Sequence, residues 1–200
     1  MRIKTNLSLF DAIEKMLQGL CYWMGYRYEC YSGHPITEFA AIDIAVGVLS
    51  AHINHSTYSI RCEYPYSKID ARTTKERADL VILQKVKDEN AGTMKYVPIC
   101  VIEFKFANDA NGGVWSDINK LNSLHSSLSI SRIAVLLSHG HPAIINDFVD
   151  NVCLPNEAAK KKIVSKKNVK SIPLAVIRST KAMESKNTRS PYRAIAIELI

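Results

Sequence analysis

The stretch of sequence that decides the fold is Val97-Pro-Ile-Cys-Val-Ile-Glu-Phe-Lys-Phe106, an apolar run that holds two charged residues. A run of this length that is apolar on both faces is typical of a strand at the centre of a sheet. Because side chains alternate along a strand, Glu103 and Lys105 are expected on one face. Ile99 and Val101 are expected on that face too, and the other face is expected to carry Cys100, Ile102, Phe104 and Phe106. Burying an unpaired charge costs on the order of several kcal/mol, so Glu103 and Lys105 need partners or a metal ion.

A second apolar strand with one acid comes before this run, Arg77-Ala-Asp-Leu-Val-Ile-Leu-Gln84. The polar residues 85–95 between the two runs favour a hairpin that pairs them. In that pairing Asp79 lies close to Glu103, and two close carboxylates share either a proton or a divalent cation. Oxygen ligands favour Mg²⁺ or Mn²⁺, and a Lys105 ammonium beside such a cation can orient water or stabilise phosphorane charge.

The remaining pattern predicts a mixed α/β domain, with one sheet flanked by helices. Apolar spacing predicts a helix over 7–24 that Gly25 ends, and a well-buried helix over 36–54, from Phe39 to Ile53, that Thr37 caps. The aromatic residues at 22, 23, 26, 28 and 31 are expected to cover the edge of the core. Strands are expected at 58–66, 77–84, 96–106, 133–137, 172–177 and 194–200, and further helices at 115–128 and after Pro142.

Asp79, a hairpin and then Glu103-Phe-Lys105 resemble the PD-(D/E)xK nuclease superfamily, which has the restriction-endonuclease-like fold. The family's αβββαβ core matches residues 36–138 in element order, with Arg61-Cys-Glu-Tyr-Pro65 similar to its first strand. The chain departs at Ala78, where the proline of the family name would stand. The length of the chain predicts a single domain over 1–200, of which the resemblance covers this core. The pattern of the sequence adds an N-terminal helix and a C-terminal strand extension that is basic over about 155–200.

The resemblance also implies roles for individual residues. Asp79, Glu103 and the carbonyl of Phe104 would bind Mg²⁺ or Mn²⁺, and Lys105 would position or activate water. Many members add an acid from the helix before the first strand. Glu38 is the candidate, with Asp43 behind it, and a simple N-terminal helix acid is the alternative. Members also often carry a Lys on the helix after the third strand; Lys120 fits, and a surface salt bridge with Asp117 is the alternative. Glu63 is interpreted as an exposed strand acid, with the edge of the site as the alternative.

The function that follows from the resemblance is metal-dependent hydrolysis of a phosphodiester bond, with DNA favoured over RNA. Such a nuclease would serve restriction, repair, mobile elements or defence, and a homodimer would help cleavage of both strands. Two alternatives stay open. One is an RNA-cleaving enzyme of the same fold, and the other is a non-catalytic nucleic-acid-binding protein that kept this fold.

The charge of the chain supports a polyanionic partner. The net charge is +7 and the pI is about 9.1, which favours a polyanion such as nucleic acid, or an anionic membrane surface, as the partner. Residues 160–193 hold eleven Lys or Arg and one acid, Glu184, which leaves a net charge of −3 for the rest of the chain. This segment is expected to contact the phosphate backbone through Lys160, Lys161, Lys162, Lys166 and Lys167. A second set of candidate phosphate contacts precedes Asp79 and consists of Lys68, Arg72, Lys75 and Arg77.

Other classes of function lack support in the sequence. There is no GxxxxGK[ST] loop, no Gly-x-Ser-x-Gly elbow and no HExxH motif. His139-Gly-His141 is interpreted as a turn, and the five scattered cysteines predict neither disulfides nor a zinc site. The N-terminus has no secretory pattern, and no apolar run reaches the ~20 residues of a membrane span, so a cytoplasmic protein without a membrane partner is expected.

Overall fold

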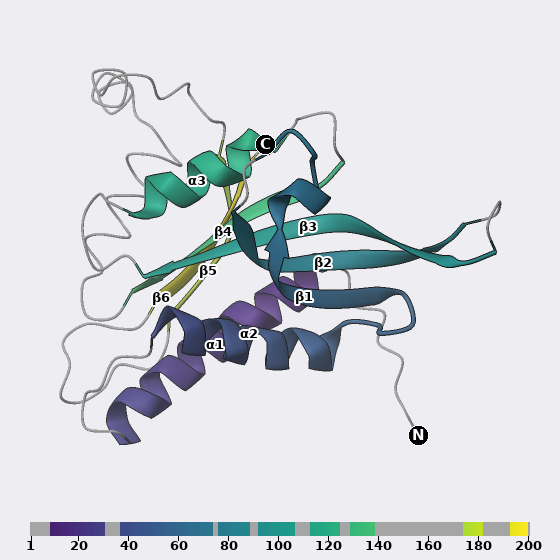
Figure 1. Ribbon diagram of the computed structural model, residues 1–200. Helices are drawn as coiled ribbons and strands as arrows, with labels where there is room; N and C mark the ends of the chain where they lie inside the picture. Colours follow the sequence, from purple (N-terminus) through teal and green to yellow (C-terminus); the bar gives the residue numbers. More distant parts are fainter. Residues whose placement is uncertain are drawn as a thin grey trace, which may run out of the picture.

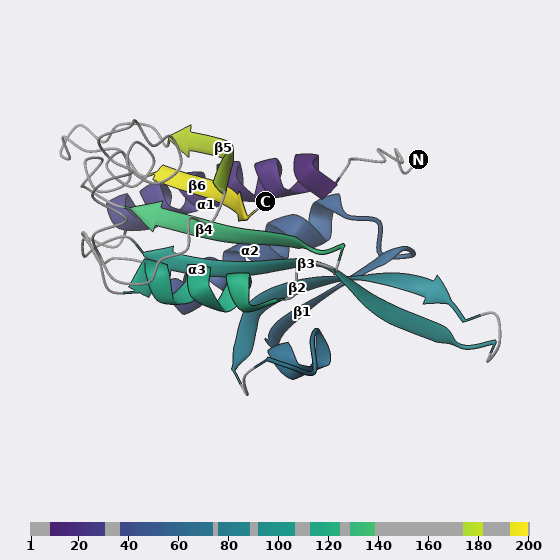
Figure 2. The same ribbon diagram turned by 90° about the horizontal axis from the view of Figure 1, so that it is seen from above.

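Six strands form one mixed sheet in the order β1-β2-β3-β4-β6-β5 (Figures 1 and 2). This computed structural model describes residues 9–30, 37–73, 76–88, 92–106, 113–124, 129–138, 174–181 and 193–199. The strands are β1 (Tyr58–Pro65), β2 (Arg77–Lys87), β3 (Met94–Phe106), β4 (Ser131–Ser138), β5 (Leu174–Lys181) and β6 (Arg193–Leu199). The predicted mixed α/β class is confirmed.

Helices cover both faces of the sheet (Figure 1). They are α1 (Leu9–Cys30), α2 (Glu38–His52) and α3 (Gly113–Ser123), and a short 3₁₀ helix, η1 (Tyr66–Lys68), follows β1. The apolar faces of α1 and α2 pack on Ile102 and Phe104 of β3, whereas α3 lies on the opposite face with Val101. The helices therefore bury the two faces of β3 separately, as expected for a central strand that is apolar on both sides.

The pairing of the strands makes β3 the centre of the sheet. β3 runs antiparallel to β2 and parallel to β4, and α3 lies between β3 and β4 in the chain. β6 pairs with both β4 and β5, so the C-terminal strands belong to the same sheet as the predicted core. Over residues 38–138 the elements follow the order helix, three strands, helix, strand.

Two irregularities in the β2–β3 pair shape the surface of the sheet. Their register runs from Lys87↔Met94 to Leu80↔Ile102 and stops there, although both strands continue. A shift at Ile82/Leu83 leaves Ile99 without a partner in this register, which is a β-bulge. The prediction that Ile99 shares a face with Glu103 is therefore wrong, because the bulge turns Ile99 toward the core under α1 and α2.

The start of α2 follows the predicted capping. The Thr37 hydroxyl accepts a 3.2 Å hydrogen bond from the Ala40 N–H, and Glu38 is the first helical residue. Phe39, by contrast, is 76% exposed, so the prediction that it is buried is wrong. The buried positions of α2 are Ala41, Ile42, Ala45 and Leu49, and Phe39 lies off this stripe.

The prediction for the end of α1 is also wrong. The helix passes through Gly25 and continues to Cys30. A glycine inside a helix costs only about 1 kcal/mol, and the burial of Leu17, Leu20, Cys21 and Met24 on the same helix offsets that cost. The aromatic residues Tyr22, Trp23 and Tyr26 are exposed and contact one another, so they do not cover the core.

Several predicted features lie outside the described residues. They are the helix after Pro142, the turn at 139–141 and the lysine-rich segment around residues 160–170. No helix in the described parts of the chain is both long and apolar enough to cross a membrane.

The central position of β3 gives a test of the fold. Ile102 is fully buried, so Ile102→Ala should lower the free energy of unfolding by about 2–5 kcal/mol, measured by urea denaturation. Val97→Ala on the same strand should cost less than about 0.5 kcal/mol, because Val97 is exposed. Equal losses for the two variants would contradict this arrangement.

Candidate active site

The candidate site forms where β2 and β3 stop pairing. Beyond Leu80↔Ile102 the next N–H that β3 offers toward β2 belongs to Phe104, and the Asp79 side chain accepts it at 2.7 Å through Oδ2. Asp79 therefore occupies the place that a backbone carbonyl would hold in a continuous ladder. The separation brings a carboxylate from β2 against the end of β3 that carries Glu103 and Lys105.

Asp79 and Glu103 form a close pair of carboxyl groups, as predicted. Glu103 is 2% exposed, and its Oε1 accepts a 2.6 Å hydrogen bond from the Tyr66 hydroxyl. Burial, followed by the charge of Asp79 and a hydrogen bond with it, raises the pKa of Glu103 to about 9. Burial also raises the pKa of Asp79, although the Phe104 N–H and Glu103 hydrogen bonds oppose this. The pair therefore holds a proton at neutral pH in the absence of a cation.

Tyr66 is positioned to support this pair. Burial, then the Glu103 carboxylate, raises the pKa of the Tyr66 hydroxyl far above its ordinary value, so the hydroxyl stays protonated and donates. Tyr66 begins η1 directly after β1, and its N–H bonds to the carbonyl of Glu76 just before β2. The turn after β1 is thereby fastened to the strand that carries Asp79.

The two carboxylates fit a hard divalent cation. The Tyr66 hydroxyl binds Oε1 of Glu103 and the Phe104 N–H binds Oδ2 of Asp79, so each group keeps one oxygen outside these two bonds. The N–H and C=O of a strand residue point toward the same neighbouring strand, so the Phe104 carbonyl faces the Asp79 side as well. Mg²⁺ commonly takes one or two carboxylates and fills the rest of its shell with water. Within the described residues no group of three or more His, Cys, Asp or Glu side chains is arranged as a metal site.

Lys105 lies between two helices on opposite faces of the sheet. Its Nζ is 3.2 Å from Glu38 at the start of α2 and 3.8 Å from Asp117 on α3. The Glu38 carboxylate also lies 3.5 Å from the Phe106 N–H, beyond Lys105 on the same strand. Glu38 is therefore an N-terminal helix acid that also contacts Lys105, and its role as a further acid of an active site stays a prediction.

Lys120 joins the same group of charges through Asp117. Their salt bridge is 2.8 Å long, which confirms the pairing predicted from their three-residue spacing. The pair is not on the open surface, because Asp117 is 7% exposed. Burial lowers the pKa of the Lys120 ammonium, but the hydrogen bond and charge of Asp117 outweigh it, and the pKa is raised overall. Lys120 is close enough to Glu103 for their charges to interact.

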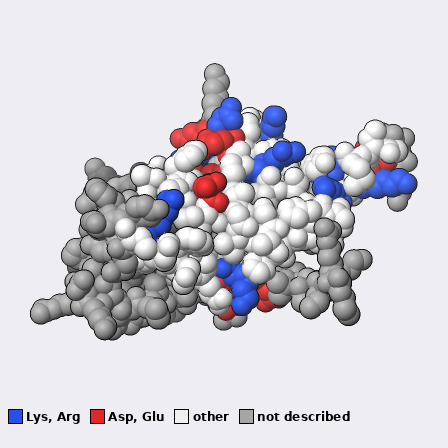
Figure 3. Space-filling model, turned by 90° about the horizontal axis from the view of Figure 1, so that it is seen from below, with Lys and Arg blue, Asp and Glu red and all other residues white. Residues whose placement is uncertain are grey.

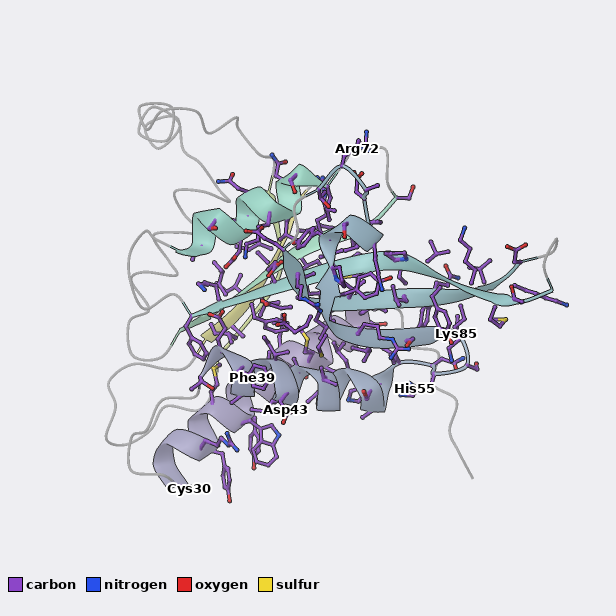
Figure 4. All side chains as sticks on the ribbon, viewed as in Figure 1. Cys30, Phe39, Asp43, His55, Arg72 and Lys85 are labelled. Atoms are coloured by element: carbon purple, nitrogen blue, oxygen red, sulfur yellow. The ribbon has the colours of Figure 1, made fainter. Side chains whose placement is uncertain are left out.

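The candidate phosphate contacts before Asp79 differ from one another. Lys68 is exposed and is the last residue of η1, the short helix that begins with Tyr66. Arg72 is held by both oxygens of Asp70 at 3.0 Å, and Figure 4 places it beyond η1. Arg77 donates a 2.8 Å hydrogen bond to the Glu63 carbonyl. Of these, Lys68 has the most freedom to reach a phosphate.

Other predicted residues are not brought into this group. Lys75, Lys160, Lys161, Lys162, Lys166 and Lys167 lie outside the described residues. Asp43 is exposed on α2, five residues beyond Glu38 (Figure 4). Glu63 is exposed on β1, between Cys62, which pairs with Leu80, and Tyr64, which pairs with Ala78. Its φ of 50° is left-handed, a conformation often found beside functional sites.

Two residues of the group were not predicted as site residues. The sequence indicates Tyr66 only as the end of a strand, and nothing in its neighbouring sequence marks a contact with Glu103, 37 positions later. It indicates Asp117 only as the partner of Lys120. Its place on the apolar stripe of α3, with Val114, Ile118 and Leu121, is the signal that would have indicated burial.

Comparison with protein-family models, curated proteins and solved structures finds no match to this chain.

The chemistry of the site is inferred from the charges of its own residues. Four carboxylates, Asp79, Glu103, Glu38 and Asp117, meet two ammonium groups, Lys105 and Lys120. Such a cluster has an excess of negative charge, which a proton relieves in part and a divalent cation relieves fully.

The raised pKa of Glu103 predicts how stability depends on pH. Between its ordinary pKa of 4.5 and about 9, the folded chain keeps a proton that the unfolded chain loses. The contribution of protonated Glu103 to the free energy of unfolding is therefore fully present below about pH 4.5. It is lost progressively as the pH rises to about 9. In metal-free buffer Glu103→Gln should flatten this decline in Tm, because glutamine imitates the protonated acid at every pH.

Asp43→Asn is the matched control, since it removes an exposed acid outside the cluster. It should leave the wild-type slope of Tm against pH unchanged. A Glu103→Gln variant with the wild-type slope would show that Glu103 is ionised in the folded protein throughout this range.

Proposed function

We propose that this chain is a metal-dependent nuclease of the PD-(D/E)xK type that hydrolyses phosphodiester bonds in DNA. The observation that carries the proposal is the placing of Asp79 and Glu103 side by side where β2 and β3 separate, with Lys105 two residues further along the same face. The order of elements from α2 to β4 and the covering of both sheet faces by helices support a restriction-endonuclease-like core.

The cluster is poorly explained as a purely structural ion network. A buried carboxyl pair that must hold a proton costs stability unless something compensates it. An apolar pair of similar size would stabilise the same position between η1 and α3 at least as well. A site that binds a cation explains why the chain keeps a carboxyl pair that lowers its stability. Carboxyl groups with perturbed pKa values are typical of functional sites.

Each residue then has a definite task. Asp79, Glu103 and the Phe104 carbonyl would hold Mg²⁺ or Mn²⁺, and the cation supplies Lewis-acid stabilisation of negative charge on the phosphoryl oxygens. Lys105 orients the attacking water and stabilises the charge that develops on the phosphate. Glu38 and Asp117 act as positioning residues, because they hold the Lys105 ammonium from two sides. Tyr66 fixes the orientation of the Glu103 carboxyl.

Cleavage assays on purified variants test this proposal. Wild-type protein with Mg²⁺ should cleave duplex DNA, and Asp79→Asn and Lys105→Ala should each lower the rate by about 10² or more, because each removes a charge that acts in the transition state. Asp43→Asn and Lys15→Ala are the matched controls, since both lie outside the cluster and are exposed. The rate is measured on labelled duplex DNA, single-stranded DNA and RNA of one sequence.

The choice of substrates separates the alternatives. Faster cleavage of RNA than of either DNA, with the same loss in both active-site variants, would establish the RNA-cleaving enzyme instead. Binding of nucleic acid without cleavage of any substrate by the wild type would establish the non-catalytic protein.

Metal binding has a test that does not depend on activity. Mg²⁺ or Mn²⁺ should raise the Tm of the wild type, because a ligand that binds only the folded state stabilises it. The rise should grow with pH between about 6 and 9, because the cation displaces the proton shared by Asp79 and Glu103. Asp79→Asn should lose the rise and Asp43→Asn should keep it. An equal rise in all three proteins would place the cation elsewhere.

A further inference from the structure

The β2–β3 hairpin extends past the body of the molecule as an arm (Figures 1 and 2). Pairing with β1 ends at Tyr58↔Gln84, whereas β2 and β3 continue to pair as far as Lys87↔Met94. Residues 84–87 and 94–97 therefore form a two-stranded ribbon, which is called the arm. Large apolar side chains on it are exposed, and they are Val86, Met94, Tyr96 and Val97. None of the four belongs to either described core cluster, so the arm has an apolar surface that no described part of the chain covers.

The arm is continuous with the face of β2 that carries the candidate site. Side chains alternate along a strand, so Lys85 and Lys87 lie on the face of β2 that carries Val81 and Leu83. Cross-strand partners share a face, which adds Tyr96 and Met94 from β3. Arg61 of β1 faces Val81 and belongs to this face too. The face thus begins beside the candidate site and ends with lysines and exposed Met94 and Tyr96.

The charge of the arm favours a polyanion. Its strands carry Lys85, Lys87 and Lys95, whereas the acids Asp88 and Glu89 follow β2 in the sequence. Figure 3 shows basic side chains along the side of the molecule that leads to the arm. Lys85 is fastened, because its ammonium donates to the His55 carbonyl where β1 begins (Figure 4). Lys87 and Lys95 are exposed and extend from the ribbon.

We propose that the arm binds double-stranded DNA by entering its major groove, with Lys87 and Lys95 on the flanking phosphates and Tyr96 and Met94 against the groove wall. The proposal rests on the proposed nuclease function and names its substrate class. A two-stranded ribbon fits the major groove of B-form DNA, which is about 12 Å wide. The deep, narrow major groove of an RNA duplex does not admit such a ribbon.

The length of β2 sets where the arm contacts the duplex. Asp79 and Lys87 are eight residues apart, which is about 27 Å along an extended strand. Base pairs of B-form DNA are about 3.4 Å apart, so with β2 aligned along the duplex axis the arm would reach about eight base pairs from the phosphate at Asp79. The sheet that positions the carboxylates then also sets a distance along the substrate.

Binding measurements in EDTA test this proposal separately from cleavage. Fluorescence anisotropy compares Asp79→Asn protein with the same protein carrying Lys87→Gln and Lys95→Gln, on a DNA duplex of about 30 base pairs between about 50 and 200 mM salt. The arm variant should bind about tenfold more weakly, and the slope of log K against log salt should fall by about 2, as expected for two lost phosphate contacts. Lys15→Gln with Arg27→Gln on α1 removes the same charge and should change neither quantity.

Duplex length and type give a second measurement. The difference between the arm variant and its parent should disappear on DNA duplexes shorter than about eight base pairs and on an RNA duplex of the same sequence. An unchanged salt slope, or an equal loss of affinity on the RNA duplex, would overturn the proposal. So would a wild-type dimer in sedimentation experiments that Met94→Ser with Tyr96→Ser dissociates, because the arm would then cover a second copy of the chain.

The two proposals fail in distinguishable ways. If the arm variants bind DNA like their parent while the wild type cleaves and Asp79→Asn does not, the nuclease function stands and the role of the arm is rejected. If the arm variants lose affinity while wild type and Asp79→Asn are equally inactive, the arm binds DNA and the nuclease function is rejected.

Discussion

The hydrogen bond from the Phe104 N–H to the Asp79 carboxylate takes over where the backbone pairing of β2 with β3 stops. Had the ladder continued, a carbonyl of β2 would have accepted this N–H, and the Asp79 side chain would have pointed away from the break. The separation therefore places a charged group inside the sheet at a position where it is partnered. Glu103, Tyr66 and the charges around Lys105 are all arranged around this one opening.

The opening explains why so many charges gather at the end of β3. Glu103 is buried beside Asp79, so it must be protonated or share a cation, and Tyr66 satisfies its other oxygen. Lys105 is held by Glu38 from one face and Asp117 from the other, which connects α2 and α3 across the sheet. A cluster with this excess of carboxylates suits a divalent cation and a phosphate ester better than it suits a stable core, which is the physical basis of the proposed function.

Local patterns in the sequence predicted most of the fold. The apolar run 97–106 indicated a central strand, Thr37 indicated the start of α2, and the alternation of 77–84 placed Asp79 on a face shared with Val81 and Leu83. Errors came where tertiary packing overrides local preference. Gly25 does not end α1, because buried neighbours outweigh the cost of glycine, and Ile99 leaves the face of Glu103 at a β-bulge that no local signal marks.

By itself the sequence determined which charged residues are enclosed in apolar strands, because hydrophobic alternation and burial follow from nearest neighbours along the chain. It thereby identified Asp79, Glu103 and Lys105, and by resemblance Glu38 and Lys120. Only the tertiary structure decided which groups they meet. The contact of Tyr66 with Glu103, the bridging of Lys105 by Asp117 and the projecting arm depend on register, twist and helix docking. These join residues far apart in the chain, and their energies appear only when the whole sheet is assembled.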